Sequence, residues 1–152
     1  MSLKPGDRVP DFTLPDQDGK PTSLRELLSE GCLVLYFYPR DDTPGCTAEA
    51  CSFRDDYDAF IQAGARVVGV SSDGVVSHRQ FADKHRLPFP LLSDGEGKLR
   101  RTFGVPRTLG ILDGRVTYVI DAQRIVRHMF NSQLRTRKHV EEALHVLRKL
   151  QR

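Results

Sequence analysis

Two of the three cysteines, Cys46 and Cys51, lie five residues apart in a segment that follows a run of apolar residues. That run, predicted to be a strand, stops at Pro39, and the next helix is expected to begin close to Cys46. A sulfur at a helix N-terminus meets unpaired amides and the positive end of the helix dipole, which favour the nucleophilic thiolate. The hydroxyl of Thr43 could turn toward that sulfur or toward a molecule bound above it. We therefore interpret Cys46 as reactive; the alternative is a cysteine that only caps the helix or packs.

Cys51 lies in the same predicted helix as Cys46. Helical rise and rotation put the two Cα atoms roughly 8–9 Å apart, whereas a disulfide does not form beyond roughly 7 Å without backbone movement. A disulfide between them therefore requires that the helix first unwinds locally. The spacing allows Cys51 to be a resolving thiol, which captures an oxidised Cys46, and equally allows it to be a small core residue.

Other uses of the cysteines fit less well. A plant-type iron–sulfur site shares the spacing C-x4-C, but it needs C-x2-C next and a fourth cysteine, which the chain lacks. A zinc site would need histidines, and none shows ligand spacing to another histidine or to the cysteine pair: His78, His85, His128, His139 and His145. We therefore expect no metal. Cys32 begins the apolar run and is expected to pack there.

The chain has 152 residues, and we expect a single domain over residues 1–152. With 39% hydrophobic and 28% charged residues, its composition is typical of a globular protein. The longest apolar run, Cys32 to Tyr38, is far shorter than the roughly 20 residues of a membrane helix. The N-terminal segment lacks the apolar stretch of a signal peptide, so we expect a cytoplasmic location, or an organellar one if a transit peptide has been removed. The net charge of +3 is concentrated in residues 135–152, which argues against a nucleic-acid surface.

Hydrophobic periodicity predicts strands that alternate with helices. Strands are expected near residues 12–14, 32–38, 66–70, 91–92, 116–120 and 125–130, the last two joined as a hairpin. Helices are expected from residue 23, over 47–62, over 77–86, over 98–103 and over 137–150. Ser23 with Glu26, and Ser77 with Gln80, have the spacing of capping boxes. This order predicts an α/β domain with a mixed central sheet flanked by helices, and a thioredoxin-like topology fits it.

The segment Pro39-x-x-x-Thr43-x-x-Cys46 resembles the P-x-x-x-T-x-x-C active-site motif of the peroxiredoxins. The longer string YFYPRDDTPGCTAEACSFRD is similar to the peroxiredoxin Q subfamily, also called bacterioferritin comigratory protein, in which the resolving cysteine lies five residues after the peroxidatic one. Other stretches agree in order and spacing: PDFTLPDQDGKPTSL, GVSSD, LPFPLLSDGEGKLRRTFGV and GRVTYVID. The resemblance therefore extends from about Lys4 to the last predicted helix.

The resemblance implies a thioredoxin-like fold and a thiol peroxidase that reduces hydrogen peroxide and organic hydroperoxides without a cofactor. It implies that Cys46 is the peroxidatic cysteine and Cys51 the resolving one, and that thioredoxin or a similar dithiol protein reduces their disulfide. Pro39 would shield the loop, and Thr43 would hydrogen-bond the peroxide and the thiolate. The subfamily also implies a monomer or a weak dimer, with no nucleic-acid or membrane partner.

Arg115 falls where the family places its active-site arginine, and Glu49 matches a family glutamate that helps to orient the arginine network. Judged from the residues alone, Arg115 would be an ordinary charge at the start of a strand, with Arg107 a nearby competitor. Attack of sulfur on an O–O bond needs a permanent cation and directed donors, which a guanidinium provides. The position in the motif favours Arg115.

Two other functions use the same residues. A thioredoxin-like disulfide oxidoreductase that acts on proteins would need C-x-x-C, which the chain lacks. A redox-regulated binding module or peroxide sensor would use Cys46 and Cys51 without catalytic turnover. Consumption of many equivalents of peroxide, rather than one, distinguishes the peroxidase from the sensor.

Overall fold

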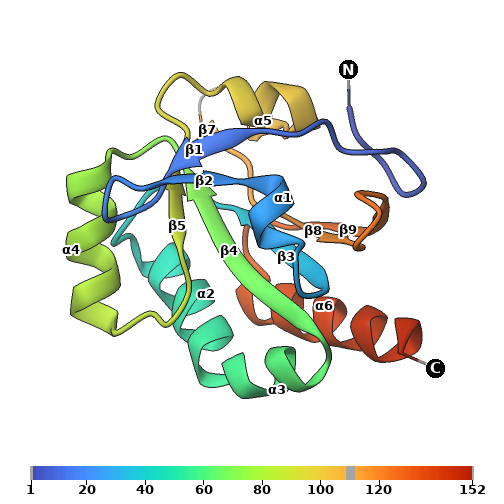
Figure 1. Cartoon of the computed structure of the whole chain (residues 1–152). Helices are drawn as coiled ribbons and strands as arrows, with labels where there is room; N and C mark the ends of the chain where they lie inside the picture. Colours follow the sequence, from blue (N-terminus) through green and yellow to red (C-terminus); the bar gives the residue numbers. More distant parts are fainter. Residues whose placement is uncertain (1, 109–111, 152) are drawn as a thin grey trace.

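The computed structural model describes residues 2–108 and 112–151. Its centre is a five-stranded sheet in the order β5-β4-β3-β8-β9 (Figure 1). The strands of this sheet are β3 (Cys32–Phe37), β4 (Ala65–Ser71), β5 (Leu91–Ser93), β8 (Val116–Ile120) and β9 (Val126–Asn131). β3 pairs in parallel with β4, and β4 with β5, whereas β8 is antiparallel to both β3 and β9. The predicted mixed central sheet is confirmed.

Helices cover both faces of this sheet. They are α1 (Leu24–Leu27), α2 (Pro44–Asp55), α3 (Tyr57–Gln62), α4 (Val75–His85), α5 (Lys98–Phe103) and α6 (Thr136–Leu150). α2, α3, α4 and α6 contribute to the apolar cluster on one face, and α1 and α5 to the cluster on the other. Two short hairpins join β1 (Thr13–Pro15) to β2 (Pro21–Ser23) and β6 (Arg107–Thr108) to β7 (Leu112–Asp113). Hydrophobic periodicity predicts only the first of these four short strands.

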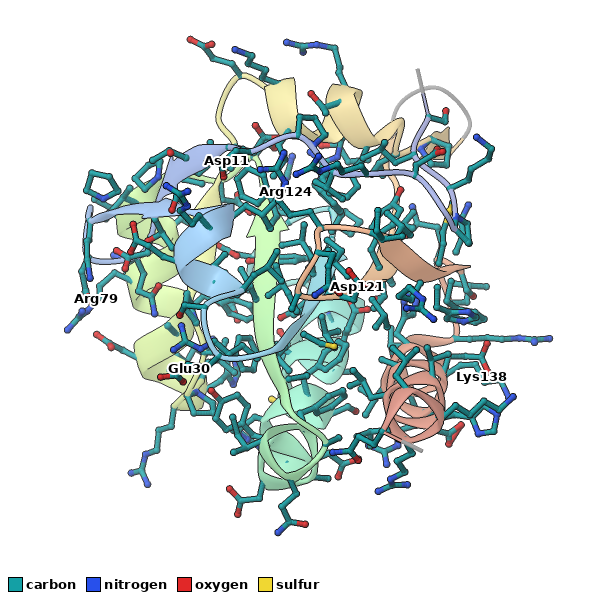
Figure 2. All side chains as sticks on the ribbon, turned by 45° about the vertical axis from the view of Figure 1, so that its right-hand side comes forward. Asp11, Glu30, Arg79, Asp121, Arg124 and Lys138 are labelled. Carbon is teal, nitrogen blue, oxygen red and sulfur yellow. The ribbon has the colours of Figure 1, made fainter. Side chains whose placement is uncertain are left out.

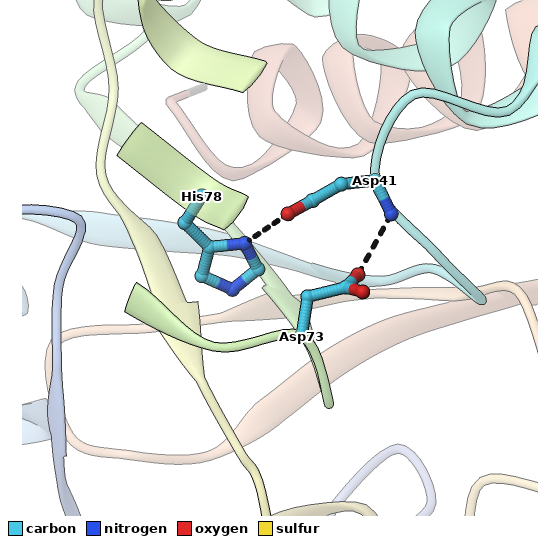
Figure 3. A group of neighbouring side chains, drawn as sticks. All are labelled: Asp41, Asp73 and His78. Atoms are coloured by element: carbon cyan, nitrogen blue, oxygen red, sulfur yellow. Dashed lines mark hydrogen bonds and ion pairs between the residues drawn. The ribbon is translucent and has the colours of Figure 1, made fainter. Parts of the chain in front are cut away.

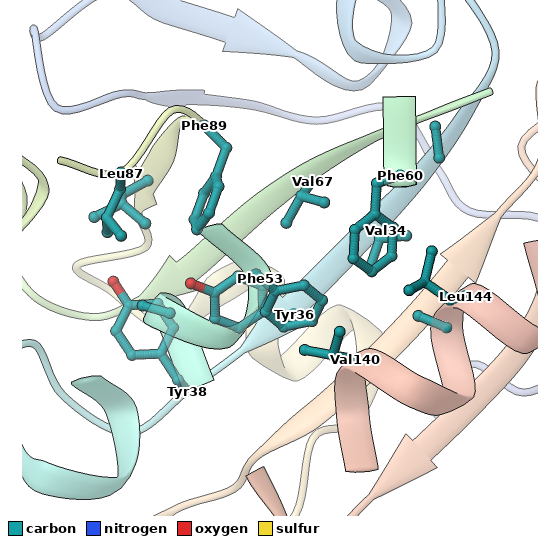
Figure 4. Packing of buried hydrophobic residues seen from close by; sticks show 14 of the residues in the cluster. Val34, Tyr36, Tyr38, Phe53, Phe60, Val67, Leu87, Phe89, Val140 and Leu144 are labelled. Carbon is teal, nitrogen blue, oxygen red and sulfur yellow. The ribbon is translucent and has the colours of Figure 1, made fainter. Parts of the chain in front are cut away.

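β3 lies in the middle of the sheet and is buried on both faces. Its side chains alternate, so that Val34 and Tyr36 enter one apolar cluster while Leu35 and its alternate neighbours enter the other. Tyr36 stacks on Phe53 of α2 with 4.5 Å between the ring centroids, and both lie among the labelled core residues of Figure 4. This packing holds α2, which carries Cys46, against the sheet.

The helix expected over residues 47–62 differs from the structure at its start and in its middle. It begins at Pro44, because Thr43 is extended (φ −83°, ψ 156°) and proline is favoured in the first helical turn. It ends at Asp55, and α3 follows after Asp56, whose φ of −100° and ψ of 12° depart from helical values. The apolar spacing continues through this break, so periodicity does not reveal it.

One of the two predicted capping boxes is present in part, because Ser23 caps the amide of Glu26 but the Glu26 carboxylate accepts from the Ser23 hydroxyl and not from its amide. Ser23 Oγ accepts a hydrogen bond from the amide of Glu26 at 3.2 Å and contacts the Glu26 carboxylate at 3.3 Å. The predicted helix start at Ser77 is wrong, because α4 begins at Val75 with Gly74 as its N-cap. The Ser77 hydroxyl instead donates to Asp41 at 2.8 Å, a partner 36 residues away that local spacing cannot indicate.

Charged side chains cover the outside of the molecule, where Arg79 and Lys138 point away from the core (Figure 2). α6 buries Val140, Leu144 and Leu147, so its basic residues form a solvated outer face. No helix in the described part of the chain is long and apolar enough to cross a membrane.

Candidate active site

The antiparallel pairing of β3 with β8 brings the loop after β3 and the residue before β8 to the same end of the sheet. Phe37, the last residue of β3, pairs with Val116, the first residue of β8. Arg115 therefore lies beside the segment that runs from the end of β3 into α2. Cys46 and Arg115, which are 69 positions apart in the sequence, meet there.

Cys46 is the third residue of α2, and only 1% of its surface is exposed. Nη2 of Arg115 lies 3.3 Å from Sγ of Cys46, within hydrogen-bond geometry. A guanidinium donor and the free amides of a first helical turn both stabilise negative charge on sulfur. The site therefore places donors that favour negative charge next to a sulfur that is shielded from bulk water.

Arg115 is fixed by two partners besides the sulfur. Nη1 donates to Oε1 of Glu49 at 2.6 Å, and Nε donates to the carbonyl oxygen of Gln133 at 3.0 Å. Burial alone would lower the pKa of Arg115, but its electrostatic interactions and hydrogen bonds with Glu49 and Cys46 more than offset burial and raise that pKa. Arg115 is thus a permanent cation whose planar donors are held in one orientation.

Glu49 lies one helical turn after Cys46 and is fully buried. Burial raises the pKa of the Glu49 carboxyl to about 7, although the charge of Arg115 acts to lower it. Oε2 of Glu49 has no hydrogen-bond partner among the described residues and lies 3.6 Å from Nδ1 of His139. Glu49 is therefore a carboxyl group that titrates near neutral pH in contact with Arg115.

A pocket of about 380 Å³ opens at this edge of the molecule, and most of its lining surface is apolar. It is lined by Pro39, Arg40, Thr43, Gly45, Arg115, Gln133 and Leu134. The Thr43 hydroxyl donates to the carbonyl oxygen of Arg40 at 3.3 Å. The structure thus places the predicted residues Pro39 and Thr43 on the wall of the pocket, and Cys46, Glu49 and Arg115 in one hydrogen-bonded group.

Buried hydrogen bonds anchor the loop that precedes Cys46 (Figure 3). The Asp41 carboxylate accepts from the Tyr38 hydroxyl at 2.6 Å and contacts Nδ1 of His78 at 2.7 Å. The Asp41 amide donates to the Asp73 carboxylate at 2.7 Å. The carboxylate oxygens of Asp41 and Asp73 and a ring nitrogen of His78 are close enough together to bind a metal ion, but they take part in these hydrogen bonds. The network ties the start of the loop to α4 and to the segment that precedes it.

Cys51 is half-buried on α2, and all three cysteines are free thiols. Cys46 and Cys51 lie in one continuous helix, so a disulfide between them requires local unwinding, as their spacing predicts. Cys32 is half-buried at the start of β3 and packs against the edge of an apolar cluster. Cys32 thus packs in the apolar region as expected, but its side chain is only partly buried.

Two contributors to the site are missed from the sequence. Gln133 offers its carbonyl oxygen to Arg115, a contact that any residue type could make and that no residue pattern indicates. His139 is considered only as a possible zinc ligand, and its place near Glu49 is missed. Its position beside Val140, on the apolar face of a predicted helix, could have indicated that it is buried. The side chain of Arg107, the competitor of Arg115, lies outside the described part of the structure.

A sequence model of the family described as AhpC/TSA matches residues 5–129 of the chain. The chain belongs to the AhpC/TSA family. A curated relative, the chloroplastic peroxiredoxin Q of Triticum aestivum, is 49% identical over 146 residues, which cover 95% of this chain and 67% of that protein. The predicted membership of the peroxiredoxins is confirmed, and the protein is a cysteine-based thiol peroxidase.

Solved structures of similar proteins agree with this assignment. The peroxidoxin BcpB of Mycobacterium tuberculosis is 45% identical and superposes with a TM-score of 0.92, covering 97% of this chain and 98% of that one. The bacterioferritin comigratory protein of Xanthomonas campestris, studied for alkyl peroxide reduction, is 33% identical with a TM-score of 0.84, covering 93% of this chain and 92% of that one. These matches confirm the thioredoxin-like fold and do not favour the alternative of a sensor without turnover.

Proposed function

We propose that Cys46 is the peroxidatic cysteine of this peroxidase and Cys51 its resolving cysteine. The observation that carries the proposal is the 3.3 Å contact between Nη2 of Arg115 and Sγ of Cys46. It places a permanent cation on a buried sulfur at the start of a helix, where a thiolate is stabilised and can act as a nucleophile.

In the first step the thiolate of Cys46 attacks one oxygen of a hydroperoxide. An S–O bond forms as the O–O bond breaks, so the sulfur loses two electrons and becomes a sulfenic acid. The departing oxygen takes up a proton and leaves as water or an alcohol. Arg115 stabilises the negative charge as it moves from sulfur to oxygen. The Thr43 hydroxyl, which donates to the carbonyl oxygen of Arg40 in this structure, turns to donate to the bound peroxide, and Pro39 shields the loop.

In the second step the thiol of Cys51 attacks the sulfenic acid of Cys46. An S–S bond forms and the sulfenic oxygen leaves as water. The first turns of α2 unwind for this step, while Asp41 keeps the preceding loop tied to His78 at 2.7 Å. A dithiol protein of the thioredoxin type then reduces the disulfide by thiol–disulfide exchange.

Replacement of Cys51 by serine should separate the two steps. The first oxidation should stay as fast as in the unmodified protein, because Cys46 and Arg115 are intact. Turnover with thioredoxin should fall to a single equivalent of peroxide per protein, because no intramolecular disulfide forms. Oxidation of NADPH through thioredoxin reductase measures this, with Cys32→Ser as the matched control. Undiminished turnover by Cys51→Ser would remove the resolving role.

Gly45 lies directly beneath Arg115, where a Cβ atom would be 3.1 Å from Nη2. Gly45→Ala should therefore push the guanidinium a few tenths of an ångström away from the sulfur. We expect the rate constant of Cys46 oxidation to fall by about tenfold, since a misplacement of about 1 Å can cost about 10²-fold. Stopped-flow oxidation by hydrogen peroxide tests this, and Gly74→Ala, where a Cβ meets open space, is the control. Equal rates for the two variants would rule out this role of Gly45.

The pocket fits hydroperoxides that carry an alkyl group as well as hydrogen peroxide. Its rim includes Leu134, of which 91% is exposed, and most of its lining surface is apolar. Comparing the rate constants for hydrogen peroxide and tert-butyl hydroperoxide tests this substrate range.

Three predictions from the sequence stay predictions: that the chain is a single domain, that it acts as a monomer or weak dimer, and that it is cytoplasmic. The Triticum relative is a chloroplast protein by name.

A further inference from the structure

Arg115 is a single cation that hydrogen-bonds two groups, each of which can carry a negative charge. Nη2 donates to Sγ of Cys46 at 3.3 Å, and Nη1 donates to Oε1 of Glu49 at 2.6 Å. All three side chains are buried, with exposed fractions of 1% for Cys46, 0% for Glu49 and 4% for Arg115. In a buried site an unbalanced charge is strongly unfavourable. One positive charge therefore balances a thiolate or a carboxylate, but not both.

The surroundings of the second oxygen of Glu49 favour a proton there. Oε2 has no hydrogen-bond partner among the described residues, and it lies 3.6 Å from Nδ1 of His139. Nε2 of His139 lies 2.8 Å from the carbonyl oxygen of Ser132, which only accepts, so Nε2 carries the hydrogen. Nδ1 is then an acceptor, and the Thr117 hydroxyl donates to it at 2.7 Å. His139 therefore has no proton on Nδ1 to donate to Glu49, because its hydrogen is on Nε2 and its Nδ1 accepts from Thr117.

Among the residues that the structure describes, the other titratable groups around Glu49 supply no second cation. Cys46 lies on the same helix, Tyr36 lies on β3, Arg115 precedes β8 and His139 lies on α6. Burial lowers the pKa of His139 to about 4, so its imidazole is neutral at physiological pH. Burial raises the pKa of Tyr36 well above its ordinary value, so its hydroxyl is neutral too. Burial also raises the pKa of Glu49 to about 7, which fits a carboxyl that exchanges its proton in this range.

We propose that Glu49 keeps a proton on Oε2 while Cys46 is a thiolate, and releases it when Cys46 becomes a sulfenic acid. The inference rests on the proposed role of Cys46. Before the reaction the buried group holds Arg115 positive, Cys46 negative and Glu49 neutral. Afterwards it holds Arg115 positive, Cys46 neutral and Glu49 negative, so its net charge stays at zero. Glu49 is thus a positioning residue that leaves the charge of Arg115 free for sulfur.

The protons balance in this sequence. Attack of the thiolate forms the S–O bond, breaks the O–O bond and produces one hydroxide or alkoxide, which takes up one proton. The proton released by Glu49 equals that demand, so the solution around the protein loses none. In Glu49→Gln the side-chain amide keeps an oxygen for Arg115 but has no proton to release. The solution must then supply one proton for each sulfenic acid that forms.

Proton uptake during oxidation tests the inference. Cys32→Ser and Cys51→Ser together stop the reaction at the sulfenic acid, and a pH indicator in weakly buffered solution just below neutral pH reports the protons. We expect no uptake with Glu49 present and one proton per protein with Glu49→Gln. Glu141→Gln, which changes an exposed glutamate of α6, should behave like the parent. Equal proton uptake in Glu49→Gln and in the parent would overturn the inference. If the parent with Cys32→Ser and Cys51→Ser formed no sulfenic acid at Cys46, the proposed function would be overturned instead.

A second measurement covers the case in which Glu49→Gln does not fold. In Cys46→Ser the competing thiolate is absent, so the carboxyl of Glu49 should ionise at a pH lower by at least about one unit, as expected for strongly coupled sites. NMR titration of isotope-labelled glutamate measures this midpoint, and it requires no turnover. An unchanged midpoint in Cys46→Ser would contradict the competition for Arg115.

Discussion

Replacement of Cys46 by serine is expected to lower peroxide consumption by at least about 10³-fold, the scale on which loss of a nucleophile acts. A serine hydroxyl is not ionised at neutral pH, even with the guanidinium of Arg115 beside it. The substitution removes no packing volume of consequence at a position that is 1% exposed, so the fold should persist. Peroxide consumption in excess dithiothreitol measures the effect, because a small dithiol bypasses the need for Cys51.

Cys32→Ser is the matched control for this prediction. It makes the same chemical change at a half-buried cysteine that lies at the opposite end of β3 from the active-site loop. We expect near-normal peroxide consumption from Cys32→Ser. Normal consumption by Cys46→Ser, or its loss in Cys32→Ser alone, would show that the reactive cysteine has been misassigned.

Replacement of Arg115 by lysine should lower the rate constant of Cys46 oxidation by about 10²–10³-fold, the cost of removing a donor that stabilises developing charge. The guanidinium reaches three acceptors at once: Sγ of Cys46, Oε1 of Glu49 and the carbonyl oxygen of Gln133. A lysine ammonium is a point charge that cannot span this arrangement. The positive charge is kept, so the loss measures the fixed geometry of the donors.

Arg127→Lys is the control for the arginine prediction. Its guanidinium is also paired with a carboxylate, that of Asp121 at 3.1 Å, but its side chain is 46% exposed and lies on β9 beside the end of β8 that is opposite Arg115. Stopped-flow oxidation and thermal unfolding should both be nearly unchanged in this variant. If Arg115→Lys reacted as fast as Arg127→Lys, Arg115 would have no role in activating the sulfur.

Local sequence patterns predicted the elements that position the site. The apolar run that begins at Cys32 became the central strand, and the turn over residues 121–124 became the link between β8 and β9. These predictions succeed because burial on both faces and turn chemistry are properties of neighbouring residues. The break at Asp56 escaped prediction because the apolar spacing on either side of it is continuous.

The site itself could be predicted only in part. The helix start close to Cys46 is a local feature, and motif position supplied Arg115 and Glu49. Their contacts depend on the pairing of β3 with β8, which joins residues far apart in the chain. The same holds for the Asp41–His78 pair, which spans 37 residues and ties the active-site loop to α4. Such contacts follow from tertiary packing, and spacing in one sequence does not encode them.

The oxidation product of the unmodified protein tests the proposed mechanism most directly. Reduced protein is treated with one equivalent of hydrogen peroxide, its remaining thiols are alkylated, and the intact chain and its proteolytic peptides are weighed without reduction. The mechanism predicts a monomeric chain that has lost two hydrogens, with Cys46 joined to Cys51 and Cys32 alkylated. A disulfide-linked dimer, or a disulfide that includes Cys32, would contradict it.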